Sequence, residues 1–445
     1  MTRCAALVVA VVAVAAAVVL PAVPAAAAPG PADAPEYWFD TWSVNQLWSQ
    51  GARGQGITIA EIDTGVNAAL PGLAGRILPG KDFGPAGGDG RIDRQIKQFG
   101  HGTAMASLMV SRPSTLGITG LAPGAQVLPI AVPLTGTTDA GPDDHLASAI
   151  TWAADHGAKV ISMSLGGTRT PSADATSCPS DEQAAIFYAL RKGAVLLAAG
   201  GNRGTAGSPV EEPGVCLGVI AVGAVDRSGT VADFSSRHPY LTLDAPGVNI
   251  PSLSRIPGAA YSGDGTSQAT AITSAVMALV WSKYPNLTGR QVVARILATL
   301  DNRTAKPNPA YGYGTLDGYA AVTAHVPTDA ANPVYAAAAP FAARARAIAL
   351  TKTPTPAPPA AQPVKSTGTF KIGSSPRLLV PRVLIALAVA FAALLLLLVL
   401  IALAQVRRRR YRASALARTP AGPLPVRVDG DGTQWHEIQA PAAPE

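Results

Sequence analysis

The sequence predicts an α/β fold in which a central, mostly parallel sheet is flanked by helices, with one transmembrane helix near the C-terminus. The apolar runs 57–62 and 193–201 have the length and composition of parallel strands that are buried on both faces. The runs 104–110 and 269–284 combine apolar and small residues and predict helices. Residues 383–404 form an uncharged apolar stretch of about 22 residues, which is long enough to cross a bilayer as a helix.

Residues 1–28 have the pattern of a signal peptide. Arg3 precedes an apolar core that ends near Leu20, and small residues that suit cleavage follow it. An uncleaved anchor is the alternative. Export favours an oxidising compartment, and once Cys4 is removed, Cys178 and Cys216 remain as an even pair. We therefore predict a disulfide between these two cysteines rather than two free thiols.

Residues 29–55 form a short extension before the folded domain, which we place at residues 56–326. Chains below about 40 residues rarely bury a core of their own, so we do not expect this extension to be a folded inhibitory prodomain. Its aromatic residues predict instead that it packs against the folded domain. These residues are Tyr37, Trp38, Phe39, Trp42 and Trp48.

Three short motifs carry the residue types of a nucleophilic catalytic centre. Asp63 lies in Ala-Glu-Ile-Asp-Thr-Gly-Val at the end of a predicted strand, His101 lies in Gly-His-Gly-Thr, and Ser267 lies in Gly-Thr-Ser-Gln-Ala-Thr. His101 and Ser267 directly precede predicted helices, whose N-termini favour developing negative charge. A carboxylate, an imidazole and a hydroxyl in the order Asp, His, Ser follow the order of the subtilisin triad. Each motif alone is a common turn or loop sequence, so the prediction depends on their order and context.

With this order and context, residues 42–322 resemble the subtilisin-like serine protease family. The resemblance implies a subtilisin-like fold and no required cofactor. It implies that Ser267 is the nucleophile and that His101 acts as general base and then as general acid. Asp63 would orient the imidazole ring and balance the charge of the imidazolium.

The resemblance also implies residues that bind the substrate. Asn202, in the Gly-Gly-Asn turn that ends the apolar run 193–201, falls at the position that donates to the oxyanion. The segment Ser-Met-Ser-Leu-Gly-Gly is similar to the family's substrate-pairing strand, which binds an extended peptide by strand addition. The substrate-binding residues that it implies are Ser164, Leu165 and Gly166.

The sequence departs from the family pattern at three positions. Gln268 stands where a large apolar residue usually follows the serine, and Ala271 stands where the helix usually carries a proline; neither residue does chemistry. Glu61 lies two residues before Asp63, so strand alternation puts both carboxylates on one face of a buried segment. Either Glu61 is a paired or protonated carboxylate, or it tunes the triad, since buried carboxylates tend to have raised pKa values.

The C-terminal part of the chain predicts a membrane anchor. Residues 327–382 are rich in Pro, Ala and Thr and lack a helical or strand period, which predicts an extended linker and juxtamembrane segment. The residues after the span at 383–404 carry more positive charge than those before it. The positive-inside rule therefore predicts that the folded domain is outside and that residues 405–445 are a basic cytoplasmic tail. The arginines after the span are Arg407, Arg408, Arg409, Arg410 and Arg412, and the basic residues before it are Lys371, Arg377 and Arg382.

The charge of the chain does not point to nucleic acid. Much of the net charge of +7 belongs to the arginine cluster beside the membrane, so the isoelectric point near 9.4 has a simpler explanation. The sequence has no Walker, Rossmann or zinc-binding spacing. A Gly/Thr/Asp loop of the kind that binds calcium in subtilisins contains Asp139, Asp143 and Asp144, but it lacks an EF-hand spacing. A structural calcium ion is therefore left open, and no metal ligand is assigned.

The order of all these segments resembles the mycosins, the membrane-anchored subtilases of actinobacterial type VII secretion systems. The resemblance implies a serine endopeptidase anchored in the cell membrane that processes exported substrates of the secretion system, stabilises its membrane complex, or does both. Its partners would be peptide or protein substrates and the membrane components of that system. The alternatives are a general cell-envelope subtilase with the same chemistry and a scaffold of the secretion complex whose activity is dispensable.

Overall fold

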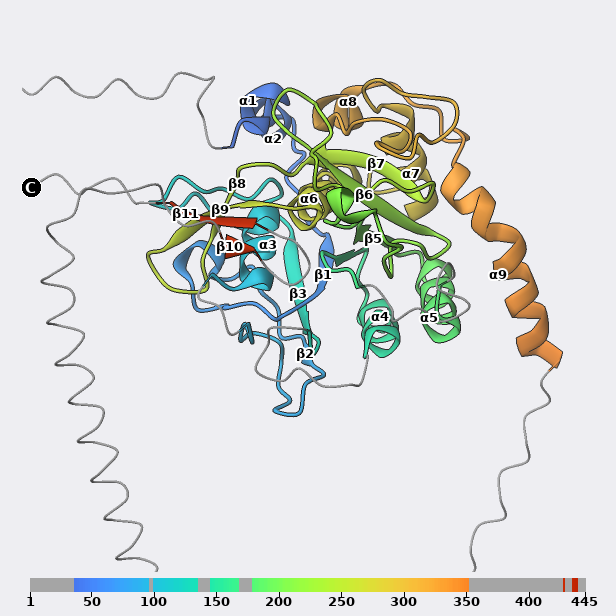
Figure 1. Ribbon diagram of the computed structural model, residues 1–445, viewed down its shortest axis with the longest axis horizontal. Coiled ribbons are helices and arrows are strands. Elements are labelled where there is room, and N and C mark those ends of the chain that lie inside the picture. The colour runs from blue at the N-terminus through green and yellow to red at the C-terminus, as the bar shows by residue number, and fades with distance from the viewer. Residues whose placement is uncertain are drawn as a thin grey trace, which may run out of the picture.

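The computed structural model describes residues 36–95, 99–134, 145–167, 178–351, 427–428 and 434–438. Its centre is a seven-stranded sheet with the order β2-β3-β1-β4-β5-β6-β7, in which every pair of neighbours is parallel (Figure 1). The predicted α/β fold with a central parallel sheet is thereby confirmed. The strands are β1 (Thr58–Asp63), β2 (Lys81–Asp82), β3 (Gln126–Ala131), β4 (Val160–Met163), β5 (Val195–Ala199), β6 (Val219–Val225) and β7 (Leu241–Pro246).

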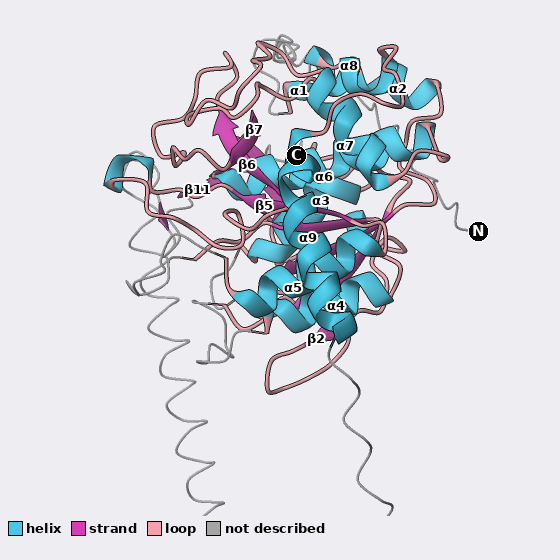
Figure 2. Cartoon of the chain, turned by 90° about the vertical axis from the view of Figure 1, so that its right-hand side faces the viewer, coloured by secondary structure: helices cyan, strands magenta, loops and turns pink. Residues whose placement is uncertain are grey.

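Helices cover both faces of this sheet. Figure 2 shows α4 and α5 below the strands and α1, α2, α7 and α8 above them. The helices up to the middle of the chain are α1 (Trp38–Thr41), α2 (Val44–Ser49), α3 (His101–Val110), α4 (Leu146–Asp155) and α5 (Ser180–Arg191). Those that follow are α6 (Thr266–Lys283), α7 (Gly289–Ala298), α8 (Gly318–Thr323) and α9 (Pro333–Thr351), and two short 3-10 helices lie at Pro71–Leu73 and Gly204–Ala206.

Strand β1 shows how the sheet divides its side chains between the two faces. Ile59 belongs to the core formed with α3 and α6, whereas Ala60 and Ile62 belong to the core formed with α4 and α5. Because side chains alternate along a strand, Glu61 and Asp63 lie on the same face as Ile59. The sheet therefore presents Asp63 toward the helices that carry His101 and Ser267.

Helix α6 is buried along almost its whole length, from Thr266 to Trp281. A helix that is buried on all sides must satisfy its polar side chains internally. The hydroxyls of Thr270 and Thr273 donate to carbonyl oxygens one turn earlier, at 2.8 and 2.7 Å. The N-terminus of α6 is thus held by packing on every side.

The N-terminal extension forms α1 and α2, which lie beside α8 in Figure 1. Trp38, Trp42 and Leu47 are buried in the same core as α3 and α6. The indole N–H of Trp48 donates to the carbonyl oxygen of Leu121 at 2.9 Å. The aromatic residues of this extension therefore contribute to the main core.

Helix α9 corrects one prediction. An extended linker is expected from the composition of residues 327–382, but residues 333–351 form a helix of 19 residues. Alanine has the highest helix propensity, and the many alanines here outweigh Pro340, which lies inside the helix and lacks an N–H group to donate. Pro333 stands at the start of the helix, where proline is well tolerated. The rest of the predicted linker lies outside the described residues.

A second sheet contains four strands in the order β10-β11-β9-β8, with antiparallel neighbours. They are β8 (Ile250–Leu253), β9 (Ala260–Asp264), β10 (Arg427–Val428) and β11 (Gln434–Ile438), and Figure 1 shows the two C-terminal strands in red beside β9. This pairing requires residues 434–438 to lie on the same side of any membrane as the folded domain. The arginine cluster predicts the opposite side for this tail, so the two arrangements exclude each other.

The predicted membrane segments cannot be compared with the structure. The signal peptide at 1–28 and the span at 383–404 both lie outside the described residues. Among the helices that the structure does describe, none is long and apolar enough to cross a membrane.

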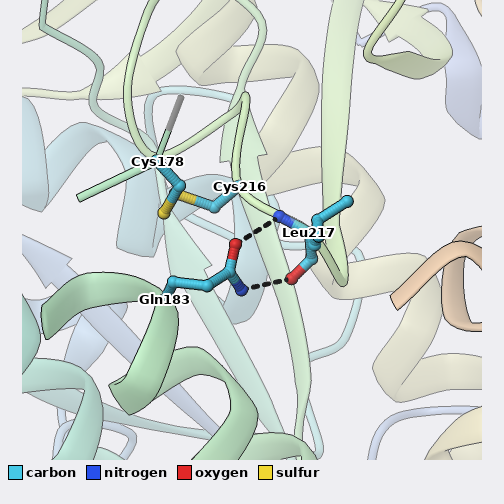
Figure 3. The surroundings of a disulfide bond; sticks show 4 residues. All are labelled: Cys178, Gln183, Cys216 and Leu217. Carbon is cyan, nitrogen blue, oxygen red and sulfur yellow. Dashed lines mark hydrogen bonds between the residues drawn. A yellow bond between two sulfur atoms is a disulfide. The ribbon is translucent and has the colours of Figure 1, made fainter. Parts of the chain in front are cut away.

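Cys178 and Cys216 form a disulfide, which is the pairing that the sequence predicts (Figure 3). Their Cα atoms are 4.8 Å apart, and the two cysteines are separated by 38 positions in the sequence. Beside the bond, the side-chain amide of Gln183 in α5 donates to and accepts from the backbone of Leu217, at 2.9 Å in each case. The bond and this amide together tie the start of α5 to the segment that enters β6.

Removing the disulfide is expected to lower the free energy of unfolding by about 3 to 4 kcal/mol, because the cross-link restricts the unfolded chain. The test is urea denaturation of the folded domain carrying Ser267→Ala, which prevents self-cleavage, with and without reductant. The control is the doubly substituted Cys178→Ser, Cys216→Ser protein, which should be insensitive to the reductant. Equal stability of the oxidised and reduced proteins would contradict the expectation.

Candidate active site

Asp63 and His101 form a buried pair at the C-terminal end of β1, a central strand of the main sheet. Asp63 is the last residue of β1 and is fully buried, and His101 is the first residue of α3. Nδ1 of His101 lies 2.9 Å from each carboxylate oxygen of Asp63. This contact favours a proton on Nδ1, which places the basic lone pair of the neutral ring on Nε2. The structure thus gives His101 the tautomer that a general base requires.

The carboxylate of Asp63 is itself held in place. Its Oδ1 accepts the backbone N–H of Thr64 at 2.7 Å. The hydroxyl of Thr64 accepts the N–H of Gly102 at 2.9 Å, so the residue after the strand also contacts the first turn of α3. The strand end and the helix start are therefore joined by the Thr64–Gly102 hydrogen bond as well as by the Asp63–His101 pair.

Asp93 completes this junction, and its role was not predicted. The buried carboxylate accepts hydrogen bonds from the hydroxyl of Thr64 at 2.9 Å and from the N–H and hydroxyl of Thr103 at 2.9 and 2.6 Å. The N–H of Gln95 also donates to it, at 3.0 Å. Burial raises the pKa of Asp93, and these hydrogen bonds act in the opposite direction. Asp93 lies in a loop without a motif, so the sequence offered no signal for it.

Gly100 is required by this arrangement. Its φ of +75° lies in the left-handed region, and a Cβ atom there would lie 2.6 Å from Oδ2 of Asp93. The glycine before His101 in the Gly-His-Gly-Thr motif therefore allows the chain to turn close to the Asp93 carboxylate.

Glu61 is buried on the same face as Asp63, as strand alternation predicts. Its pKa is raised well above the ordinary value, first by burial and then by the charges of Asp63 and Asp93, while the backbone N–H of Ala106 acts in the opposite direction. Of the predicted alternatives, these surroundings favour a protonated carboxyl. A neutral Glu61 adds no charge beside Asp63.

Ser267 is the second residue of α6 and is buried. Its neighbour Thr266 donates both its backbone N–H, at 2.8 Å, and its hydroxyl, at 2.9 Å, to Oδ1 of Asn202. On the other side, β9 leads directly into this turn, and the Tyr261 ring in β9 contacts the Phe99 ring, with centroids 6.0 Å apart. Phe99 lies two residues before His101, and α3 packs against α6. The histidine and serine turns are therefore neighbours on one face of the sheet.

Asn202 lies where the chain leaves β5, and it is buried. Because Oδ1 accepts two hydrogen bonds from Thr266, the orientation of the side-chain amide is fixed and its NH₂ group is its donor. The backbone N–H of Ser267, in the first turn of α6, has no acceptor within the helix. These two N–H groups come from adjacent turns and have the chemistry of an oxyanion-binding pair.

Ser164, Leu165 and Gly166 continue directly from β4. This strand lies between β1, which ends at Asp63, and β5, which leads to Asn202. The structure therefore gathers the segment and both site residues at the C-terminal ends of three adjacent strands, where ligands bind in open α/β sheets. Gly167, the next residue, exchanges two backbone hydrogen bonds of 3.0 Å with Glu212.

The described residues include one group with the geometry of metal ligands, formed by Cys178, Glu182 and Cys216. Metal binding needs the thiolate form of cysteine, and both of these cysteines are in the disulfide. They are therefore not metal ligands in this state. Asp139, Asp143 and Asp144, which belong to the loop for which a calcium ion was left open, lie outside the described residues.

Comparisons with known proteins place most of the described residues in one family. The subtilase family matches residues 54–314. Fervidolysin from Fervidobacterium pennivorans is 34% identical over 269 residues, which cover 54% of this chain but only 36% of fervidolysin.

Two solved structures carry the similarity further. The MycP3 protease from the type VII (ESX-3) secretion system is 33% identical with a TM-score of 0.55, and the match covers 64% of this chain and 88% of MycP3. A chain in the structure of an intact ESX-5 inner membrane complex is 26% identical with a TM-score of 0.56, and the match covers 83% of this chain and 90% of that one.

Glu61→Gln tests the protonated state of Glu61. Since the pKa of Glu61 is raised in the folded state, unfolding above its ordinary value of 4.5 releases a proton, and the wild-type protein loses stability from this group as the pH rises. Glutamine does not titrate, so we expect the variant to become more stable relative to the wild type as the pH rises above 4.5, the ordinary pKa of this group. Urea denaturation at a series of pH values above this pKa measures the difference.

Asp93→Asn is a second variant rather than a control, because it removes a carboxylate that accepts several hydrogen bonds and whose charge raises the pKa of Glu61. It should destabilise the protein throughout the pH range. If the stability of Glu61→Gln runs parallel to that of the wild type at every pH, the protonated state of Glu61 is wrong.

Proposed function

The chain belongs to the subtilase family, and from this premise we propose that it is a membrane-anchored serine endopeptidase, a mycosin that serves a type VII secretion system. The observation that carries the proposal is the Asp63–His101 pair, with Nδ1 at 2.9 Å from both carboxylate oxygens. This pair lies beside the turn that brings Asn202 and Ser267 together. The arrangement suits acyl transfer by an activated serine.

The proposed reaction begins when the hydroxyl oxygen of Ser267 attacks the peptide carbonyl carbon. Nε2 of His101 takes the hydroxyl proton, and Asp63 stabilises the imidazolium that forms. The side-chain amide of Asn202 and the N–H of Ser267 donate to the oxyanion of the tetrahedral intermediate. His101 then returns the proton to the leaving amine, and water releases the acyl group by the same steps in reverse.

The substrate is proposed to be an extended peptide. Ser164, Leu165 and Gly166 continue the chain directly beyond β4. In the proposed complex their backbone groups pair with the peptide by strand addition. Such pairing uses main-chain hydrogen bonds, which are insensitive to sequence. Side-chain contacts must then supply the cleavage preference.

The secretion role is supported by the similarity to MycP3 and to a chain of the ESX-5 inner membrane complex. In this role the enzyme processes exported substrates or stabilises the membrane complex. The specific alternative is a general cell-envelope subtilase. Genes for secretion-system membrane components beside this gene would favour the first role over the second.

Anchoring is proposed from the apolar stretch at 383–404 and the arginines that follow it. The folded domain would lie outside the cell membrane and the tail 405–445 in the cytoplasm. In that arrangement β11 could not pair with β9, so the location of the tail is open to a direct test.

Asn202→Ala is expected to lower kcat by about 100- to 1000-fold with little change in KM, because the hydrogen bond strengthens as charge develops on the carbonyl oxygen. Steady-state kinetics on a fluorogenic peptide measure both constants. Asn202→Asp is the matched control, since it keeps Oδ1 but loses the donor, and it should be similarly slow. An unchanged kcat in Asn202→Ala would remove this residue from the mechanism.

The Ser267→Ala variant distinguishes a role as an enzyme from a role as a scaffold of the secretion complex. Peptidase activity should fall on the order of a million-fold, because nucleophile and base act as a unit. In a strain that lacks the protein, the variant is then compared with the wild type for export by the secretion system. Loss of substrate processing with export intact supports a processing enzyme that also stabilises the complex. Identical processing and export in the variant and wild type would leave only the scaffold role.

The topology is tested by labelling single cysteines with a membrane-impermeant maleimide in intact cells. Ala440→Cys should react only after the membrane is permeabilised, whereas Lys306→Cys on the exposed surface of the folded domain should react at once. The native Cys178 and Cys216 are in a disulfide and do not interfere. Labelling of position 440 in intact cells would instead favour the β9–β11 pairing.

A further inference from the structure

Glu211 is a buried carboxylate that lies between two parts of the proposed active site. Only 2% of the surface of Glu211 is exposed to solvent. A Cβ atom added to Gly166 would lie 2.9 Å from Oε2 of Glu211, and one added to Gly201 would lie 2.8 Å from Oε1. Gly166 belongs to the proposed substrate-pairing segment, and Gly201 directly precedes Asn202. Because neither glycine has a side chain, the carboxylate packs directly against the backbone of both segments at these positions.

The backbone holds Glu211 at this place. Its N–H donates to the hydroxyl oxygen of Tyr240 at 3.2 Å, and its carbonyl oxygen accepts the N–H of Val215 at 3.1 Å. The next residue, Glu212, exchanges two backbone hydrogen bonds of 3.0 Å with Gly167. The segment that carries Glu211 is thus bound directly to the end of the substrate-pairing segment.

One positive side chain already contacts the carboxylate. Nε of Arg203 lies 3.5 Å from Oε1, and the Arg203 side chain is 34% exposed, whereas that of Glu211 is 3% exposed. Arg203 approaches Oε1, while Oε2 faces Gly166. Burial raises the pKa of Tyr240 most; the hydrogen bond from the Glu211 N–H lowers it, and the negative charge of Glu211 raises it.

The position of the substrate follows from the proposed mechanism. The residue that supplies the attacked carbonyl has its backbone along Ser164–Gly166 and its carbonyl oxygen at Asn202. Its side chain must then leave the backbone between these two segments, toward Gly166 and Gly201. A buried carboxylate is costly unless positive charge meets it, and a lysine or arginine side chain supplies that charge with hydrogen-bond donors.

We propose that Glu211 makes the enzyme prefer substrates with lysine or arginine immediately before the cleaved bond. The inference rests on the proposed peptidase function and adds the substrate class to it. Glu211 acts here as a specificity residue and takes no part in bond breaking.

The test is a series of fluorogenic peptides that differ only in the residue before the cleaved bond, which is lysine, arginine, norleucine or glutamine. The full-length wild-type protein in detergent is expected to cleave the cationic peptides with a kcat/KM about 10- to 100-fold above the neutral ones. Glu211→Gln should lose this preference while keeping its kcat/KM on the norleucine peptide within a few-fold. Glu211→Asp should retain part of the preference, because it keeps the charge.

Two further variants separate specificity from a structural role. Glu212→Gln is the matched control at the adjacent position and should keep the full preference. Arg203→Gln should keep or increase the preference, since it removes a competing cation. If Glu211 served only to hold Arg203 beside Asn202, then Arg203→Gln and Glu211→Gln would slow all peptides equally, and the proposal would be overturned.

The outcomes also distinguish this inference from the proposed function. A wild-type enzyme that cleaves all peptides without preference overturns the inference alone. A wild-type protein that cleaves none of them, and whose Ser267 does not react with a fluorophosphonate, overturns the peptidase function as well. Thermal denaturation of each variant shows whether it is folded, and fluorophosphonate labelling of Glu211→Gln shows whether its serine is still active.

Discussion

The contact between Asp63 and His101 is the constraint on which the site depends. It joins a fully buried carboxylate at the end of β1 to the first residue of α3, and a buried carboxylate is costly without hydrogen-bond donors of this kind. A second buried carboxylate, Asp93, holds the two elements in position. It accepts a hydrogen bond from the hydroxyl of Thr64, next to the strand end, and one from the N–H of Thr103, in the first turn of α3. The geometry of the pair is thus set by backbone elements on both sides.

The order of the strands in the main sheet brings the other site residues close to the Asp63–His101 pair. β4 lies between β1 and β5, so the segments after these three parallel strands lie side by side at the C-terminal ends of the strands, although they are far apart in the sequence. Ser267 comes from another direction, in the first turn of the fully buried α6. Asn202 connects the end of β5 to the start of α6, because its side-chain oxygen Oδ1 accepts hydrogen bonds from the N–H and the hydroxyl of Thr266. A peptide laid along Gly166 would therefore meet groups from four separate elements.

Much of this could be predicted from the sequence because the motifs are local. A strand followed by Asp-Thr-Gly, and glycine-bounded histidine and serine before helices, identify Asp63, His101 and Ser267 without knowledge of their contacts. Asp93 and Glu211 were not found, because each depends on neighbours from distant segments and stands in a loop without a motif. Residues 333–351 were predicted wrongly because proline suggested an extended chain where the alanines favour a helix.

The disulfide makes the stability of the folded domain depend on whether its cellular compartment is oxidising or reducing. Cys178 and Cys216 tie α5 to the segment entering β6, and the residue that we propose to select substrates, Glu211, lies between the two cysteines in the sequence. A bond of this kind persists only in an oxidising compartment. Newly made protein in the reducing cytosol would lack it, and the loop carrying Glu211 would be less restrained there. If the protein is exported as we propose, the disulfide forms after export, and the loop that carries Glu211 gains its full restraint only there.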